Sequence, residues 1–198
     1  SLQMPVPSRW DAELELRGWR VARETQLRTG DTEDLVSACG DPDPRWTVAR
    51  SASPSEEFLA FVEPGLPPQA IARILTGPEE RVHVQLRDAA GTFVAAGRAS
   101  AAASPVGRWA GITSILVAEH ARRQGLATQV MGELARWGLA QGCTRTYLQA
   151  LRSNAPAAAL YERLGLHVHH SYEYRSPGAM DATPVRSSTS ENIRSASA

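Results

Sequence analysis

The most distinctive chemistry of the chain lies at residues 117–128, where a strand-like run passes into a helix-like run. Its centre reads Arg122-Arg123-Gln124-Gly125-Leu126-Ala127. The first amides of a helix have no partner within the helix and lie at the positive end of its dipole, so they bind anions. Gly125 permits close approach of a ligand to the backbone, and Ala127 is too small to block the third position. The segment predicts a diphosphate site; a polar loop that simply enters a helix is the alternative.

Another block follows downstream and reads Asn154-Ala155-Pro156-Ala157-Ala158-Ala159-Leu160-Tyr161-Glu162-Arg163-Leu164-Gly165-Leu166. Asn154 is a typical N-cap, and Pro156 is tolerated in a first helical turn. In the expected helix Tyr161 is rotated about 100° from Leu160, which places it away from the buried stripe. A phenol in such a position can donate a proton to a departing anion. The alternative is a Tyr at the helix edge whose hydroxyl bonds to the backbone.

Together the two blocks resemble the GNAT superfamily of acyl-CoA-dependent N-acetyltransferases. The upstream block is similar to the R/Q-x-x-G-x-G/A signature of that family, with Arg122, Gly125 and Ala127 at the defining positions. The downstream block is similar to its N-x-x-A-x-x-L-Y-E-x-x-G-F motif, with Leu166 where Phe is commoner. Two motifs in the right order at family-like spacing are more specific than either alone.

The resemblance implies roles for these residues. The amides of residues 122–128 would hold the diphosphate of CoA, and Val117 would polarise the thioester carbonyl through its N–H while the strand end pairs with the pantetheine arm. Tyr161 would be the general acid that protonates the departing thiolate. The full set expected to bind acetyl-CoA is Leu116, Val117, Arg122, Arg123, Gln124, Gly125, Leu126, Ala127, Thr128 and Asn154.

A general base is harder to identify, because residues 109–116 contain no carboxylate, which departs from part of the family. The candidates are Glu119, His120, His170 and Glu173, and deprotonation relayed by water is an equal alternative. No metal is expected. In a strand His167 and His169 share a face while His170 points away, and no Cys or carboxylate has ligand spacing to them.

The elements that must position these residues follow from periodicity. Alternating runs predict strands at residues 81–87, 93–99, 109–117, 144–151 and 166–175, the first of them half-buried. Leu126, Val130, Leu134 and Trp137 recur at helical spacing, and Gly142 ends that helix. Because a whole helix separates the strands at 109–117 and 144–151, they should run parallel. The resemblance implies an α/β fold with a mixed, largely antiparallel sheet, helices on both faces, and this splayed parallel pair as the CoA cleft.

The chain divides into three parts by this reasoning. Residues 81–175 form the acyl-CoA-binding core, and residues 1–80 are either an N-terminal segment of the same fold or a small accessory region. That region predicts a strand at 19–28 and helices at 31–39 and 68–75. Residues 176–198 are rich in Ser, Pro and Thr, which predicts a flexible tail.

Composition narrows the chemistry further. All 21 basic residues are Arg, which excludes Walker-type P-loops, protein kinases and Schiff-base enzymes, since each of these needs a Lys. The formal net charge is zero, which suits a compact anionic ligand better than a nucleic acid. Cys39 and Cys143 are far apart, and no apolar run or leader is visible, so a cytoplasmic protein without membrane contact is expected.

The sequence therefore predicts an N-acetyltransferase that moves an acetyl group from acetyl-CoA to a primary amine, on a small molecule or a protein, by direct attack in a ternary complex. A non-catalytic acyl-CoA-binding regulatory module is the alternative. A different nucleotide-binding enzyme is disfavoured by the absence of Lys and of G-x-G-x-x-G. The acceptor and the oligomeric state stay open.

Overall fold

The computed structural model describes residues 1–65 and 80–177 of the chain. The strands are β1 (Leu2–Pro5), β2 (Trp19–Asp31), β3 (Thr47–Ser51), β4 (Arg81–Arg87), β5 (Phe93–Ser104), β6 (Gly107–Val117), β7 (Arg145–Leu151) and β8 (His167–Pro177). The helices are α1 (Asp11–Leu16), α2 (Thr32–Cys39), α3 (Glu56–Val62), α5 (Leu126–Ala140) and α6 (Ala155–Arg163), with a 3₁₀ turn η1 (Glu119–Ala121). The helix expected at residues 68–75 and the tail beyond residue 177 lie outside the described residues.

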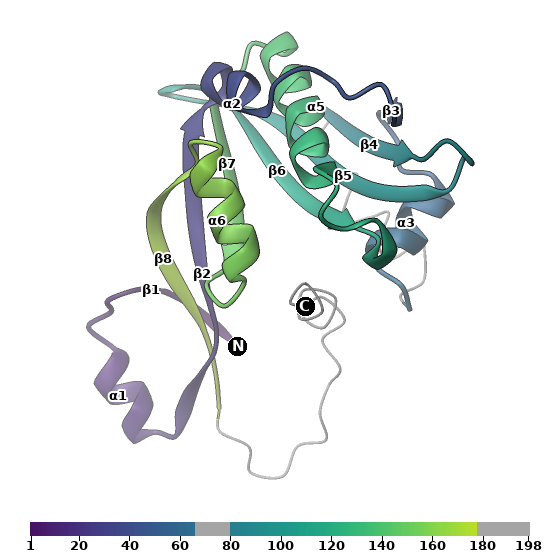
Figure 1. Ribbon diagram of the computed structural model, residues 1–198. Helices are drawn as coiled ribbons and strands as arrows, with labels where there is room; N and C mark the ends of the chain where they lie inside the picture. The colour runs from purple at the N-terminus through teal and green to yellow at the C-terminus, as the bar shows by residue number, and fades with distance from the viewer. Residues whose placement is uncertain (66–79, 178–198) are drawn as a thin grey trace.

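One eight-stranded sheet organises the molecule, in the order β1-β8-β2-β7-β6-β5-β4-β3 (Figure 1). β6 and β7 run parallel, and the remaining neighbours in the described part are antiparallel. The predicted mixed, largely antiparallel sheet with one parallel pair is therefore confirmed. β2 lies between β8 and β7, so the N-terminal residues contribute strands to the same sheet as the residues after 81.

Helices cover both faces of the sheet, as expected, and β4 shows how. Val82, Val84 and Leu86 pack in the cluster that contains α5. The alternate side chains His83 and Gln85 contact Phe58 and Ser55, at the start of α3 on the opposite face. The prediction that this strand is half-buried was wrong, because the second face is covered by α3, a helix that the sequence periodicity did not reveal.

The packing of α5 against the sheet fixes where that helix begins. Val130 and Leu134 are fully buried, and they press on β5 at Gly97, where a Cβ would lie 2.4 Å from Val130 Cγ1 and 2.9 Å from Leu134 Cδ1. Only a residue without a side chain lets the helix lie this close. The first turn of α5 is thereby held at the carboxyl end of β6, after the connection through η1.

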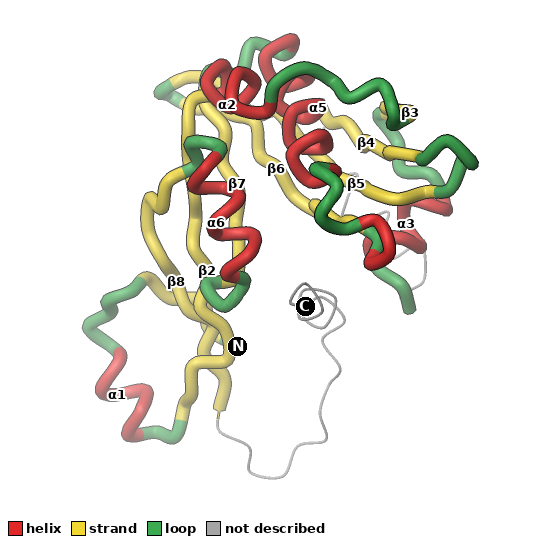
Figure 2. Tube along the Cα trace, in the orientation of Figure 1, coloured by secondary structure: helices red, strands yellow, loops and turns green. Residues whose placement is uncertain are grey.

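The parallel pair comes apart partway along its length. β6 and β7 are paired from Trp109 opposite Arg145 to Ile112 opposite Leu148, and no further. Just beyond, the register of β6 against β5 shifts between Ala96 and Arg98, and Ser114 has a φ of 55°. Such a bulge bends a strand. Figure 2 shows β6 and β7 adjacent at one end and separated at the other, with α5 and α6 following their separated ends.

Candidate active site

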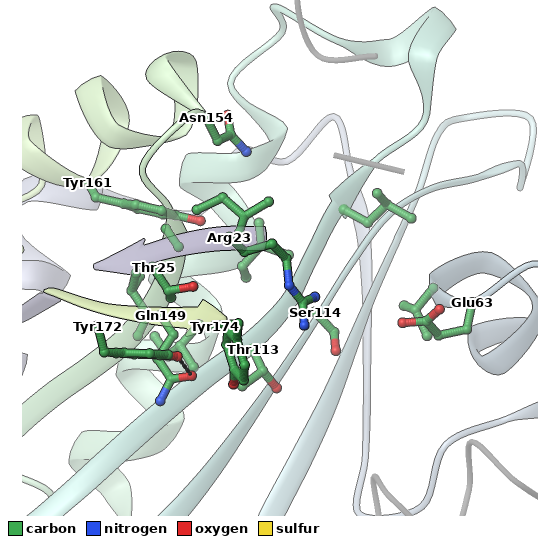
Figure 3. Close-up of a pocket in the computed structure, with 17 residues that line it drawn as sticks. Arg23, Thr25, Glu63, Thr113, Ser114, Gln149, Asn154, Tyr161, Tyr172 and Tyr174 are labelled. Atoms are coloured by element: carbon green, nitrogen blue, oxygen red, sulfur yellow. Dashed lines mark hydrogen bonds between the residues drawn. The ribbon is translucent and has the colours of Figure 1, made fainter. Parts of the chain in front are cut away.

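A cavity of about 380 Å³ occupies the space where β6 and β7 separate. Strands β2, β6, β7 and β8, helix α6 and the end of α3 all contribute to its wall. Its polar lining residues are Arg23, Thr25, Glu63, Thr113, Ser114, Gln149, Asn154, Tyr161, Tyr172 and Tyr174 (Figure 3). The cavity thus brings Asn154 and Tyr161 from the downstream sequence block beside Leu116 at the end of β6.

The carboxyl end of β6 presents a backbone donor toward the gap. The N–H of Ala118 donates to Val94 O of β5 at 2.8 Å. Because successive N–H groups of a strand point to opposite edges, the N–H of Val117 points away from β5, toward the side where β7 has diverged. The role of Val117 that the resemblance implies stays a prediction, and it needs the N–H on this edge of the strand.

The start of α5 is the place where the sequence predicts anion-binding amides. Gly125 has a φ of 81° and precedes the helix, whose first internal bond runs from the N–H of Gln129 to Gly125 O at 3.0 Å. The amides of Leu126, Ala127 and Thr128 come before that bond, in the turn where amides lack helical partners. A Cβ on Gly125 would meet nothing within 4 Å, so the space beside this backbone is open.

The flanking Arg residues are placed differently from each other. The N–H of Arg122 donates to Glu119 O at 3.3 Å, so the expectation that this amide is free for a ligand was wrong; η1 ends there and uses it. Arg123 has a φ of 63°, and its exposed side chain, like that of Gln124, lies outside the cavity lining. Leu126 is fully buried and belongs to the apolar core that packs beneath α5.

Asn154 serves the fold and lines the cavity at once. Its Oδ1 accepts a hydrogen bond from the N–H of Ala157 at 3.2 Å, which confirms it as the N-cap of α6. The same residue is part of the cavity wall. The cap therefore fixes where α6 begins relative to the end of β7.

Tyr161 is buried, whereas the sequence periodicity placed it away from the buried stripe. Its exposed fraction is 9%, and Leu164 at 3% shares its face, since residues three apart are neighbours on a helix. Leu160 is only half-buried, so α6 is rotated relative to the expectation. The hydroxyl points toward the other cavity-lining side chains (Figure 3). Burial raises the pKa of Tyr161, against a smaller opposing effect of Arg28, so the phenol stays protonated.

The four predicted base candidates are not in the cavity wall. Glu119 and His120 are exposed in η1, and Glu173 is hydrogen-bonded to Arg175 at 3.1 Å. His170 lies with its Nδ1 2.8 Å from His169 Nδ1, so the expectation that the two point apart was wrong; the register of β8 against β2 is irregular there.

Sequence reasoning missed most of the polar wall opposite Tyr161. Tyr172 and Tyr174, which alternate on β8, both line the cavity; Tyr172 donates to Gln149 Oε1 at 2.7 Å, and the Arg23 guanidinium lies 4.7 Å from the ring centre of Tyr174. The alternation of the two Tyr residues was visible in the sequence, but the face they occupy was not. Glu63 was missed because α3 was missed, although Ser55 before two Glu residues is a helix-start signal.

Within residues 1–65 and 80–177, no group of three His, Cys, Asp or Glu side chains is arranged to hold a metal ion. None of the helices in the same two ranges combines the length and apolar character needed to cross a bilayer.

Most of the chain matches a known protein family. Residues 3–175 match the family described as "Probable histone acetyltransferase Rv0428c C-terminal". The uncharacterized N-acetyltransferase YobR of Bacillus subtilis is 33% identical over 72 residues, which are 36% of this chain and 29% of YobR. The chain thus spans less than a third of that relative.

Solved structures show the same fold. A tandem GNAT protein from the clavulanic acid biosynthesis pathway superposes with a TM-score of 0.69 at 12% identity, over 91% of this chain and 64% of that one. AAC(6')-Iy in complex with the bisubstrate analogue CoA-S-monomethyl-acetylneamine gives a TM-score of 0.50 at 16% identity, over 61% and 89% of the two chains. The splayed parallel pair, the Gly125 loop and the match over residues 3–175 agree: this chain belongs to the GNAT superfamily, within the Rv0428c C-terminal acetyltransferase family.

Proposed function

We propose that the protein transfers an acetyl group from acetyl-CoA to a primary amine, by direct attack of the amine on the thioester in a ternary complex. The observation that carries the proposal is the separation of β6 from β7 beyond Ile112, with an open amide turn at Gly125 on one side and the cavity with Tyr161 on the other. A strand edge, an anion site and an acid group are the parts that thioester aminolysis needs.

The donor would lie along the end of β6. The pantetheine arm would pair with the free edge at Leu116 and Val117, as an added strand does. Its diphosphate would accept hydrogen bonds from the amides at Gln124 to Thr128, assisted by the charges of Arg122 and Arg123. Asn154 would contact the arm from across the gap, since it lines the same cavity as Leu116.

Acyl transfer would then need one bond formed and one broken. The amine nitrogen attacks the carbonyl carbon, and the N–H of Val117 stabilises the oxygen as it gains negative charge. When the C–S bond breaks, the thiolate takes a proton from the Tyr161 hydroxyl. The nitrogen releases its surplus proton, and this proton restores Tyr161, directly or through water.

A covalent acyl-cysteine is not needed by this site. Neither Cys39 nor Cys143 lines the cavity, and Cys143 is fully buried. Burial raises the pKa of the Cys39 thiol to about 11, so at neutral pH it holds little thiolate, the form that attacks carbonyl carbon. Direct transfer is therefore the simpler route.

The names of the similar proteins support a primary amine as acceptor. The matched family is described as a probable histone acetyltransferase, and AAC(6')-Iy is bound to an analogue that joins CoA to acetylneamine. The acceptor of this protein is accordingly proposed to be an amine on a small molecule or a protein.

The test is release of CoA thiol from acetyl-CoA in the presence of amines. The panel would contain alkylamines, an aminoglycoside and a lysine-containing peptide, with CoA binding measured separately by calorimetry. Turnover that depends on the amine and falls in Tyr161→Phe supports the proposal. Tight CoA binding without turnover on any amine favours the regulatory module, and absence of CoA binding refutes both.

A further inference from the structure

The cavity contains a carboxylate to which neither motif gives a role. Glu63 follows directly on α3 and is the only Asp or Glu among the described residues that line the cavity. Its neighbour Val62 is also in the wall. A carboxylate in the wall of a cavity built for amine acetylation can meet the incoming amine.

The position of Glu63 is set by a packed helix. Phe58, Leu59 and Val62 of α3 are buried and form a cluster with Phe93 and Ala96 of β5. The N–H of Glu63 donates to Leu59 O at 3.1 Å, which continues the helical bonding to this residue. The backbone that carries the carboxylate is therefore held against the sheet.

Glu63 reaches the cavity from the side opposite the donor site. α3 covers the face of the sheet that α5 does not, and α5 begins with the amides proposed for the diphosphate. In Figure 3 Glu63 and Tyr161 lie on opposite sides of the cavity residues, with Ser114 of β6 between them. A group that enters past Glu63 would thus approach the thioester from the face away from the donor's diphosphate.

The electrostatics favour a cationic ligand at Glu63. Burial raises the pKa of its carboxyl group, and no ion pair to it occurs among the described residues. The other titratable or charged groups that face the cavity are Arg23, Tyr161, Tyr172 and Tyr174. A partly buried carboxylate is stabilised by an opposite charge that arrives with the substrate.

We propose that Glu63 binds the acceptor as an alkylammonium ion and is the base that removes its proton before attack. The inference rests on the proposed function and assigns the step that it leaves open. The N–H bond of the ammonium breaks, the proton passes to a Glu63 carboxylate oxygen, and the free electron pair on nitrogen attacks the carbonyl carbon. One proton per turnover then leaves Glu63 for solvent, which balances ammonium plus acetyl-CoA against amide, CoA thiol and H⁺.

The experiment compares Glu63→Gln with Glu56→Gln, a matched change at an exposed carboxylate of the same helix outside the cavity. Thiol release from acetyl-CoA is measured from acid to alkaline pH with the best alkylamine of the panel. Hydroxylamine, which is largely uncharged at neutral pH and so need not be deprotonated before attack, is the other nucleophile. CoA affinity and melting temperature are recorded for each variant, and Glu63→Asp is included as the conservative change.

Glu63→Gln should lower kcat/KM with the alkylamine about 10²-fold or more, the usual effect of a lost general base. It should also move the acidic limb of the pH profile to higher pH, because without the base only the free amine can attack. The hydroxylamine rate, the CoA affinity and the Glu56→Gln profile should stay at wild-type levels. Glu63→Asp should keep the limb at a reduced rate. If Glu63→Gln lost as much rate with hydroxylamine as with the alkylamine, or kept the acidic limb of the wild-type pH profile, the role of Glu63 would be overturned. Turnover by the wild-type protein would still support the proposed acetyltransferase function.

Discussion

Replacing Gly125 by Ala should have two effects that can be measured separately: a loss of stability from a side chain at a positive φ, and a loss of CoA affinity. Gly125 has a φ of 81°, a conformation that costs an L residue about 1–2 kcal/mol. Part of that cost is offset because Ala restricts the unfolded chain, by about 0.4–1 kcal/mol. A Cβ there would touch no protein atom within 4 Å, so no clash adds to the balance. The expected loss of stability is about 1 kcal/mol, or a decrease in Tm of about 2–4 °C.

Gly91 supplies the matched control. It lies in the turn between β4 and β5, has a φ of 82°, and would likewise place a Cβ in open space. Gly91→Ala should therefore lose the same stability as Gly125→Ala. The two variants differ only in what lies beside the backbone, because Gly125 adjoins the amides proposed to hold the CoA diphosphate.

Calorimetric titration with CoA distinguishes the two. In Gly125→Ala the new methyl group should push the diphosphate off at least one amide, which is a charge-assisted hydrogen bond of about 1.5–3 kcal/mol. The dissociation constant should rise at least about tenfold, or roughly 1.4 kcal/mol, while Gly91→Ala binds as wild type. Equal CoA affinity in both variants, with both equally destabilised, would show that the Gly125 turn does not contact the ligand.

Three further predictions concern α6 and the sheet. Tyr161→Phe should lower kcat about 10²-fold or more and leave the CoA affinity unchanged; a wild-type kcat in this variant refutes the acid role. Because burial raises the pKa of Tyr161, the rate of the wild-type enzyme should fall only at a pH above the ordinary pKa of a phenol. Asn154→Ala removes the cap bond to the N–H of Ala157 and should cost about 0.5–2 kcal/mol in urea unfolding; an unchanged midpoint would contradict the cap. Gly97→Ala places a Cβ 2.4 Å from Val130 Cγ1 and should lower the free energy of unfolding by about 1–3 kcal/mol or more. A wild-type Tm in this variant would show that α5 does not pack as described.

The elements after residue 80 could be predicted from sequence because their periodicity is local. β6, α5 and β7 each carry a pattern of apolar residues that matches one period, and the order strand, helix, strand favours a parallel pair. Gly125 and Asn154 could be placed at helix starts for the same reason, since capping signals lie within a few residues of each other.

The rest of the site depends on contacts that are distant in sequence. The bulge at Ser114 places a non-glycine residue at a φ of 55°, and no residue type in the neighbouring sequence predicts it. The rotation of α6 that buries Tyr161 follows from how that helix meets the sheet, since Tyr161 and Leu164 face inward together. Glu63 enters the cavity only because β5 brings α3 beside β6, which lies some fifty residues further along the chain.

The central claim is that the backbone at the start of α5 grips the diphosphate of CoA. Amide ¹H–¹⁵N spectra of the labelled protein, recorded during titration with CoA, test this residue by residue. The largest shifts should fall on Gln124 to Thr128 and on Val117, and 3′,5′-ADP, which lacks both the diphosphate link and the pantetheine arm, should not reproduce them. Saturation with CoA that leaves the amides of Gln124 to Thr128 unshifted would contradict the account.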